Sequence, residues 1–253
     1  MVGRLLKNII EYPRVVGGIG PQSTAKAVWL YKHIMKAPVI STTAMTAEVA
    51  KVVENTYRDV NIAFANEVAL ACESLGVDVY EVRQLVNNLP IIEGKFNPHR
   101  NLHVPGAGVG GHCLTKDPWL LKYGVTKYGK KPVELRITEN SRALNKQMPQ
   151  HTVELLEEAL QETHLTQVDD LKVAVLGAAF IEDSDDPRNT PTADIVALLS
   201  QKGYNGHVHD PYVRPEEVSF PINRNLEQTL HDAQAIIVVT AHQIYKNLDL
   251  QWT

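Results

Sequence analysis

Residues 171–180 read LKVAVLGAAF, an apolar run broken only by Lys172 and ending just after Gly177. A continuous apolar run that ends in a glycine turn is typical of a buried parallel strand. Segments 192–203 (TADIVALLSQKG) and 226–233 (LEQTLHDA) are helix-like, and 206–210 (GHVHD) and 235–241 (AIIVVTA) are strand-like. This alternation predicts a doubly wound α/β domain over residues 166–253.

Upstream of this domain the apolar residues recur at helical spacing. The pattern predicts a long helix over Thr46–Leu75, with Gly76 as its C-terminal stop. A shorter helix is expected around Val79–Asn88 and a second long amphipathic helix over Leu135–Leu160. We therefore expect a helical domain over residues 43–165.

The N-terminal segment predicts one helix between two strands. RVVGGI (14–19) and APVISTT (37–43) are strand-like, and PQSTAKAVWLYKHIM (21–35) is helix-like, with Pro21 near its start. Three elements are too few to close a core alone, so residues 1–42 are expected to form an incomplete α/β fragment.

Composition excludes several function classes. A net charge of −4 over 253 residues gives no reason to expect nucleic acid or an anionic membrane as a partner. The two cysteines, Cys72 and Cys113, exclude a disulfide framework and suit a reducing compartment. No apolar run has signal-peptide or bilayer length, so a soluble, cytoplasmic protein is expected.

The segment 104–118, VPGAGVGGHCLTKDP, contains most of the functional information. Cys113 follows a glycine-dense loop and precedes Lys116 and Asp117. A thiol near a cation and a carboxylate is a typical setting for a reactive thiolate, and the flanking glycines allow close approach of a substrate. The alternative is a buried structural cysteine on a glycine-rich turn, which these neighbours disfavour.

Gly106, Gly108 and Gly111 also fit the G-x-G-x-x-G pattern of dinucleotide-binding turns. That pattern is informative only when a buried strand precedes it. The preceding KFNPHRNLHVP (95–105) has two prolines and no apolar run, so we reject this interpretation.

Lys51 and Asn55 are four residues apart on the predicted long helix and therefore share a face. An ammonium and an amide that project together can stabilise a developing oxyanion or position a water molecule. The alternative is an ordinary solvated polar face.

Three segments together resemble the UDP-glucose/GDP-mannose dehydrogenase family. They are AEVAKVVENTYRDVNIAFANE (47–67), GVGGHCLTKDP (108–118) and VAVLGAAFIEDSDDPRNTPTADI (173–195). ENTYRDVNIAFANE is most similar to the UDP-N-acetyl-D-mannosamine dehydrogenase branch. The resemblance implies oxidation of a UDP-sugar primary alcohol to a carboxylate with NAD, as in UDP-N-acetyl-D-mannosaminuronate formation for polysaccharide biosynthesis.

The resemblance also implies roles for individual residues. Cys113 would attack the intermediate aldehyde to give a thiohemiacetal and later a thioester. Lys51 and Asn55 would stabilise the oxyanions, and Asp117 would order the water and the lysine. The substrate-binding residues implied by the family are Arg100, Gly110, Gly111 and Lys116, and the cofactor- or nucleotide-binding residue is Arg188. No metal site is implied.

Two positions in or next to Gly177–Arg188, the nucleotide-binding region that the resemblance implies, depart from the family pattern. Ile181 stands where a lysine is usual, and Asn189 stands where a glutamate is usual. Both substitutions bear on how firmly this domain would hold a nucleotide.

The implied architecture is an incomplete N-terminal Rossmann fragment, a central all-helical dimerisation domain and a C-terminal Rossmann-like UDP-binding domain. In the family a full NAD-binding Rossmann domain comes first, so residues 1–42 are expected to be its C-terminal remnant. We expect a homodimer through the long helix, and no NAD reduction by these 253 residues alone. One hypothesis adds a separate N-terminal NAD-binding chain. The alternative is an inactive, truncated sugar-nucleotide-binding and dimerisation module.

Overall fold

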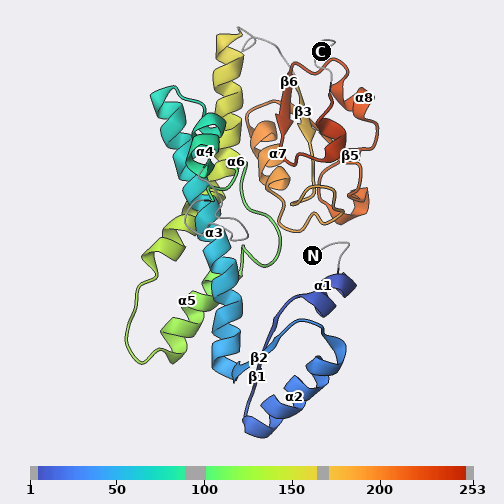
Figure 1. Cartoon of the computed structure of the whole chain (residues 1–253). Helices are drawn as coiled ribbons and strands as arrows, with labels where there is room; N and C mark the ends of the chain where they lie inside the picture. The colour runs from blue at the N-terminus through green and yellow to red at the C-terminus, as the bar shows by residue number, and fades with distance from the viewer. Residues whose placement is uncertain (1–4, 89–100, 164–170, 249–253) are drawn as a thin grey trace. The chain divides into compact units, whose positions relative to one another are not determined.

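The computed structural model describes residues 5–88, 101–163 and 171–248 (Figure 1). It divides into two compact units. The first comprises residues 1–56 and 117–133, and the second comprises residues 57–116 and 134–253. Helices and parallel strands both contribute, as the sequence predicts for an α/β chain.

The first unit contains a strand–helix–strand motif. Its elements are α1 (Leu5–Glu11), β1 (Arg14–Gly18), α2 (Pro21–Ile34), β2 (Val39–Thr43) and α5 (Asp117–Tyr128). β1 and β2 pair in parallel, with Arg14 opposite Val39. A Cβ on Gly17 would lie 2.3 Å from the Thr43 carbonyl oxygen, so the glycine allows the backbone segments to pack closely. The predicted strand, helix and strand are confirmed, and α1 was not predicted.

The helix α3 (Ala44–Leu75) runs for 32 residues without interruption. It ends at Gly76, whose φ of 67° lies in the left-handed region that glycine adopts readily. The N–H of Val77 then donates to the carbonyl of Cys72 over 3.0 Å, closing the last turn. The predicted long helix over Thr46–Leu75 is confirmed.

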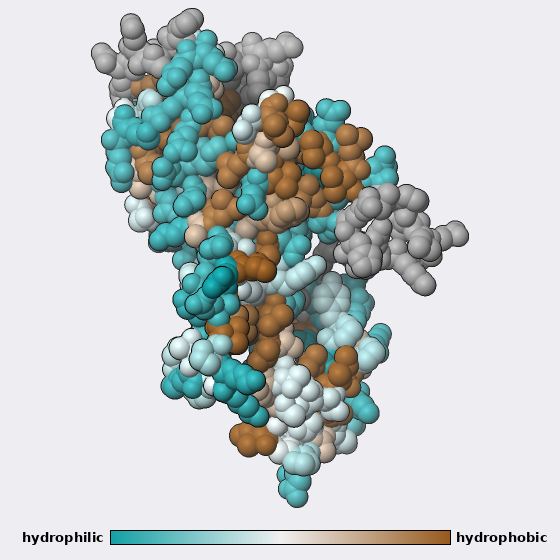
Figure 2. Space-filling view, turned by 90° about the vertical axis from the view of Figure 1, so that its left-hand side faces the viewer, coloured by the Kyte–Doolittle hydropathy of each residue, from teal (hydrophilic) through white to brown (hydrophobic). Residues whose placement is uncertain are grey.

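Apolar side chains are exposed along α3 at intervals of one or two helical turns. They are Met45, Val49, Val53, Tyr57 and Phe64, each at least 42% exposed. Figure 2 shows apolar residues at the surface among hydrophilic ones on the side of the second unit where α3 and α4 (Val79–Asn87) lie in Figure 1. Isolated exposed apolar residues are ordinary, but a row along one helix indicates a contact surface.

A buried polar network joins α3 to α6 (Arg136–Glu162) within the second unit. Arg142 pairs with Asp59 over 2.6 Å, and Asn145 donates to the same Asp59 carboxylate over 2.9 Å. Asn66 donates to Asn145 over 3.0 Å and accepts from the N–H of Gly106 over 2.9 Å. Burial raises the pKa of Asp59, and Arg142 partly opposes that rise. The network therefore fixes the start of the glycine-rich loop to the two long helices.

The α/β part of the second unit is a four-stranded parallel sheet in the order β5-β4-β3-β6. Its elements are β3 (Lys172–Leu176), α7 (Pro191–Gln201), β4 (Asn205–His209), β5 (Ile222–Asn223), α8 (Leu226–Leu230) and β6 (Ala235–Val238), with the 3₁₀ turns η1 (Pro215–Glu217) and η2 (Gln243–Tyr245). Val173 and Val175 are fully buried in the largest apolar core, which also includes Leu156 of α6 and Ile195 of α7. The predicted buried strand at 171–180 is confirmed. The two-residue strand β5 was not predicted.

Candidate active site

Residues 106–116 form a loop, here termed the thiol loop, that belongs to the second unit and leads to α5. Its glycines are required by packing against Phe180, which follows β3. A Cβ on Gly110 would lie 2.4 Å from the Cβ of Phe180. One on Gly111, whose φ is 80°, would lie 2.9 Å from the Phe180 ring. The glycines are therefore needed because the loop backbone comes close to Phe180, a requirement that the sequence pattern alone did not reveal.

Hydrogen bonds fasten the same loop to the segment before α7. The N–H of Gly111 donates to the carbonyl of Arg188 over 2.7 Å. The side-chain amide of Asn189 donates to the carbonyl of Gly111 over 3.1 Å and to the hydroxyl of Thr115 over 3.3 Å. Cys113 lies between these two attachment points and is half-buried, whereas Cys72 on α3 is buried.

Arg188 lies close enough to Cys113 for their charges to interact, but its guanidinium already has a partner. Its Nε donates to Asp186 over 2.7 Å, and its Nη2 contacts the second carboxylate oxygen. This pair raises the pKa of Arg188, and a Cys113 thiolate raises it further. The predicted nucleotide-binding cation is therefore neutralised in part by a neighbour that sequence reasoning missed. The pair is bidentate, and the Asp186 side chain is only 13% exposed, so Arg188 must give up this partner to bind another anion.

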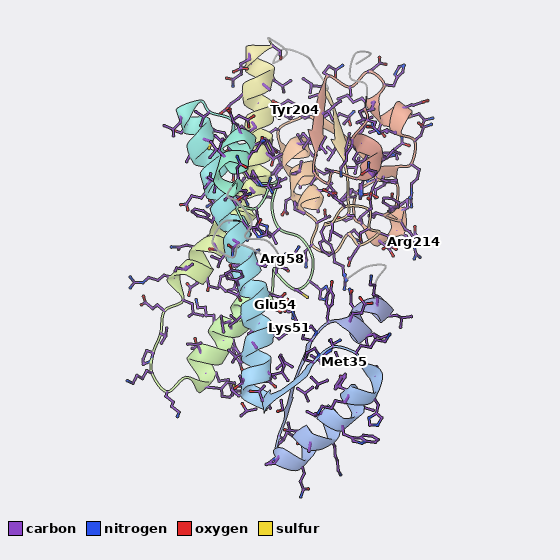
Figure 3. All side chains as sticks on the ribbon, in the orientation of Figure 1. Met35, Lys51, Glu54, Arg58, Tyr204 and Arg214 are labelled. Carbon is purple, nitrogen blue, oxygen red and sulfur yellow. The ribbon has the colours of Figure 1, made fainter. Side chains whose placement is uncertain are left out.

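The first unit brings two predicted residues together. Asn55 on α3 and Asp117 at the start of α5 are both buried, and the Asn55 amide donates to the Asp117 carboxylate over 2.5 Å. Lys51 is exposed and pairs instead with Glu54, one turn along α3, over 3.0 Å (Figure 3). Glu54 was missed, although a carboxylate three residues after a lysine on a helix is a recognisable signal.

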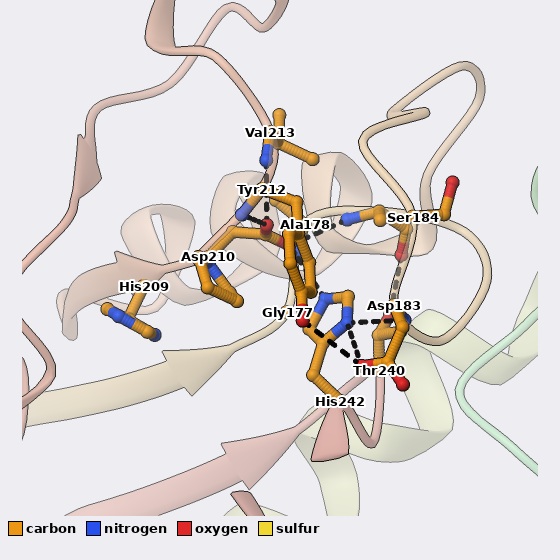
Figure 4. Close-up of polar contacts among 12 residues, drawn as sticks. Gly177, Ala178, Asp183, Ser184, His209, Asp210, Tyr212, Val213, Thr240 and His242 are labelled. Atoms are coloured by element: carbon orange, nitrogen blue, oxygen red, sulfur yellow. Dashed lines mark hydrogen bonds and ion pairs between the residues drawn. The ribbon is translucent and has the colours of Figure 1, made fainter. Parts of the chain in front are cut away.

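A carboxylate fills the turn that follows β3 (Figure 4). Asp210, at the end of β4, is fully buried and accepts hydrogen bonds from the N–H groups of Ala178 over 2.6 Å and Ala179 over 3.0 Å. Its other oxygen accepts from the N–H groups of Tyr212 and Val213, each over 2.8 Å. Burial alone would raise the pKa of Asp210, but these hydrogen bonds and one from His242 outweigh burial and hold that pKa well below its ordinary value.

His242 extends this cluster to the end of the turn. Its Nδ1 accepts from the N–H of Asp183 over 2.8 Å, so the ring proton is on Nε2, which donates to Asp210 over 3.0 Å. Gly177 has a φ of 96°, and a Cβ there would lie 2.6 Å from the Cβ of Thr240. The geometry of the turn is therefore fixed by side chains from the neighbouring strands.

Neither glycine turn that follows a described strand fits the pyrophosphate of a dinucleotide. After β3, Asp210 already occupies the N–H groups of the turn. After β1, Gly18 donates to Thr24 over 3.0 Å and Gly20 donates to Ser23 over 3.0 Å. Backbone N–H groups that are already satisfied are not available to bind a phosphate. The residues at 101–105, before the G-x-G-x-x-G of the thiol loop, form no strand.

Arg100, predicted to contact substrate, lies outside the described residues. Within the described ranges no cluster of three or more His, Cys, Asp or Glu side chains could hold a metal ion. Among the same residues, every helix is too short or too polar to cross a bilayer.

Comparison with known proteins gives the class of this chain. Residues 45–147 match the UDP-glucose/GDP-mannose dehydrogenase family, central domain, and residues 174–253 match that family's UDP binding domain. The chain belongs to the UDP-glucose/GDP-mannose dehydrogenase family, as the sequence resemblance predicted.

Individual relatives agree with this assignment. The UDP-N-acetyl-D-mannosamine dehydrogenase of Pyrococcus horikoshii is 35% identical over 98% of this chain and 54% of its own length. A solved structure of UDP-D-ManNAc dehydrogenase from that organism superposes with a TM-score of 0.84, covering 98% of this chain and 55% of the other at 35% identity. The NDP-N-acetyl-D-galactosaminuronic acid dehydrogenase of Methanosarcina mazei Go1 is 44% identical, with a TM-score of 0.86, over 100% of this chain and 53% of the other. The chain thus spans about half the length of the relatives it matches.

Proposed function

We propose that this chain provides the thiol and the UDP-sugar-binding part of an NAD-dependent UDP-sugar 6-dehydrogenase. The observation that supports this proposal most strongly is Cys113, a half-buried thiol on a loop fixed at both ends, in a chain whose other cysteine is buried. The names of the relatives point to N-acetylated amino sugars as substrates. The substrate proposed is UDP-N-acetyl-D-mannosamine, and the product is its uronate, a precursor for polysaccharide biosynthesis.

The steps assigned to this chain are thiol addition and thioester hydrolysis. The Cys113 sulfur adds to the aldehyde carbon, and the thiol proton passes to the aldehyde oxygen, giving a thiohemiacetal. Loss of a hydride from the thiohemiacetal carbon to bound NAD, with loss of the hydroxyl proton, would leave a thioester. Water then cleaves the thioester, which releases the carboxylate and restores the thiol. Lys51 and Asn55 stabilise the oxyanions of both steps, and Asp117 orders Asn55 and the water. The Lys51–Glu54 pair is exposed, so freeing the ammonium costs little.

In this proposal NAD is the hydride acceptor. We propose that a separate N-terminal NAD-binding domain or chain holds this cofactor. The backbone N–H groups of the two glycine turns that follow β1 and β3 already have hydrogen-bond partners, which supports an NAD-binding site elsewhere. UDP-sugar contacts are assigned to Gly110, Gly111 and Lys116 of the thiol loop, together with Arg100 and Arg188. In the alternative function, the same residues bind UDP-sugar in a catalytically inactive module.

The proposed organisation has a Rossmann remnant at residues 1–42, a helical dimerisation domain at 43–165 and a UDP-sugar-binding domain at 166–253. The row of exposed apolar side chains along α3 supports a homodimer through that helix. Burial of this row against a second copy would remove it from water.

We expect a polypeptide of these 253 residues to form no NADH when it is mixed with NAD and UDP-N-acetyl-D-mannosamine. Addition of a separately produced N-terminal Rossmann domain of the family is expected to start NADH formation, measured by absorbance. NADH formation by the 253 residues alone would show that these residues bind NAD themselves and that a separate NAD-binding domain is not needed. Absence of turnover with the added domain, together with retained UDP-sugar binding, would favour the inactive module.

A further inference from the structure

We propose that Asn189 is a positioning residue that holds the thiol loop closed around Cys113; this role rests on the proposed function of Cys113 as the reactive thiol. The side-chain amide of Asn189 donates to the Gly111 carbonyl over 3.1 Å and to the Thr115 hydroxyl over 3.3 Å. One donor group thus ties together the residues two before and two after Cys113. The spacing between Gly111 and Thr115 in this five-residue turn is therefore held in part by Asn189, a side chain outside the loop.

The segment that carries Asn189 is itself rigid. Asn189 has a φ of 51°, a left-handed conformation that Asn, Asp and His tolerate better than other side chains. Thr190 follows as the N-cap of α7, and its hydroxyl accepts from the N–H of Thr192 over 3.3 Å. On the other side, the N–H of Phe180 donates to the Asp186 carbonyl over 3.0 Å. The amide of Asn189 is therefore presented from a fixed backbone.

The other contacts with the loop fix its glycines, and Asn189 adds a contact from outside at Thr115, whose own hydroxyl closes the loop onto Gly111 over 2.7 Å. Arg188 accepts from the Gly111 N–H, and Phe180 packs against Gly110 and Gly111. Thr115 donates its own hydroxyl hydrogen to Gly111 over 2.7 Å and is therefore available to accept from Asn189. Removal of the Asn189 donor leaves the Gly111 side of the turn anchored and weakens the attachment of the side that follows Cys113, where Thr115 keeps its own hydrogen bond to Gly111.

The test compares Asn189→Gly with Asn189→His in the 253-residue protein. Glycine accepts the left-handed backbone but has no donor. The Nδ1 of histidine stands near the position of the lost amide, and Asn189 is exposed enough for the larger ring. Asp232→Gly is the matched control, because Asp232 has a φ of 57° and is exposed at a distant turn. Alkylation of Cys113 by iodoacetamide under native conditions is followed by mass spectrometry, with deuterium exchange of peptide 106–116 and urea unfolding in parallel.

Asn189→Gly is expected to raise the Cys113 alkylation rate about fivefold, the effect of one net hydrogen bond, and to speed exchange within 106–116 only. Asn189→His and Asp232→Gly are expected to stay within about twofold of wild type. Thr115→Val, which removes both the acceptor for Asn189 and the hydroxyl that donates to Gly111, is expected to raise the rate at least as much as Asn189→Gly. Unchanged alkylation in Asn189→Gly, or equal rates in the glycine and histidine variants, overturns the role of Asn189. A wild-type Cys113 that reacts no faster than Cys72 overturns the proposed function instead.

Discussion

Replacement of Cys113 by alanine is expected to lower steady-state NADH formation more than about 10³-fold in the chain combined with its NAD-binding domain. Without the sulfur, the aldehyde cannot be captured as a thiohemiacetal, so the second oxidation has no covalent intermediate to act on. Binding of UDP-sugar, measured by calorimetry, is expected to change little, because the thiol contributes to the chemical step.

Cys72→Ala is the control for this experiment. Cys72 is only 5% exposed, among the buried residues of α3, where a cysteine behaves as a small apolar side chain. Its replacement is expected to leave the rate within about twofold. Equal losses in the two alanine variants would show that Cys113 has no special part in the reaction.

Asp210→Asn is expected to destabilise the protein by about 3 kcal/mol and to lower Tm by roughly 6–12 °C near neutral pH. The carboxylate accepts from four backbone N–H groups and from His242, and an amide has one oxygen to offer in place of two. The amide nitrogen would face donors in a fully buried position. Thermal unfolding by circular dichroism measures the change, and Asp232→Asn, at an exposed turn, is the control.

The Asp210 effect is also expected to depend on pH. Its pKa is lowered in the folded state, so its contribution is complete above the unfolded carboxyl pKa of about 3.9 and is lost as the pH falls below that value. The difference in Tm between wild type and Asp210→Asn should therefore narrow between pH 5 and pH 3. A constant difference over this range would mean that the folded-state pKa is not lowered.

Local signals were sufficient for the main elements of the fold. The helical periodicity before Gly76 predicted α3, and the apolar run at 171–180 predicted β3. The strand β5 was not predicted because two residues are too few to show a periodic pattern. The polar network around Asp59 was not predicted because Asp59 is about 80 residues from its partners on α6, and they meet only through the packing of α3 against α6.

The candidate site was predictable where it lies in short motifs. The segments around Cys113 and Asn55 were found from spacing and residue type, and the Asn55–Asp117 hydrogen bond places two of the predicted residues together. Asn189 and Asp210 were not assigned roles. Their partners lie 78 and 32 residues away, so only the folded chain brings them into contact. The departure of Asn189 from the family pattern was the one sequence signal at either position.

Cys113 is proposed as the reactive thiol of a UDP-sugar site, and alkylation of the purified chain measures that reactivity. Iodoacetamide is added near neutral pH, and the two cysteines are followed by mass spectrometry with and without UDP-N-acetyl-D-mannosamine. We predict that Cys113 is labelled at least about tenfold faster than Cys72, and that the nucleotide sugar slows only Cys113. Equal or reversed labelling of the two cysteines, unaffected by the nucleotide sugar, would show that Cys113 is not that thiol.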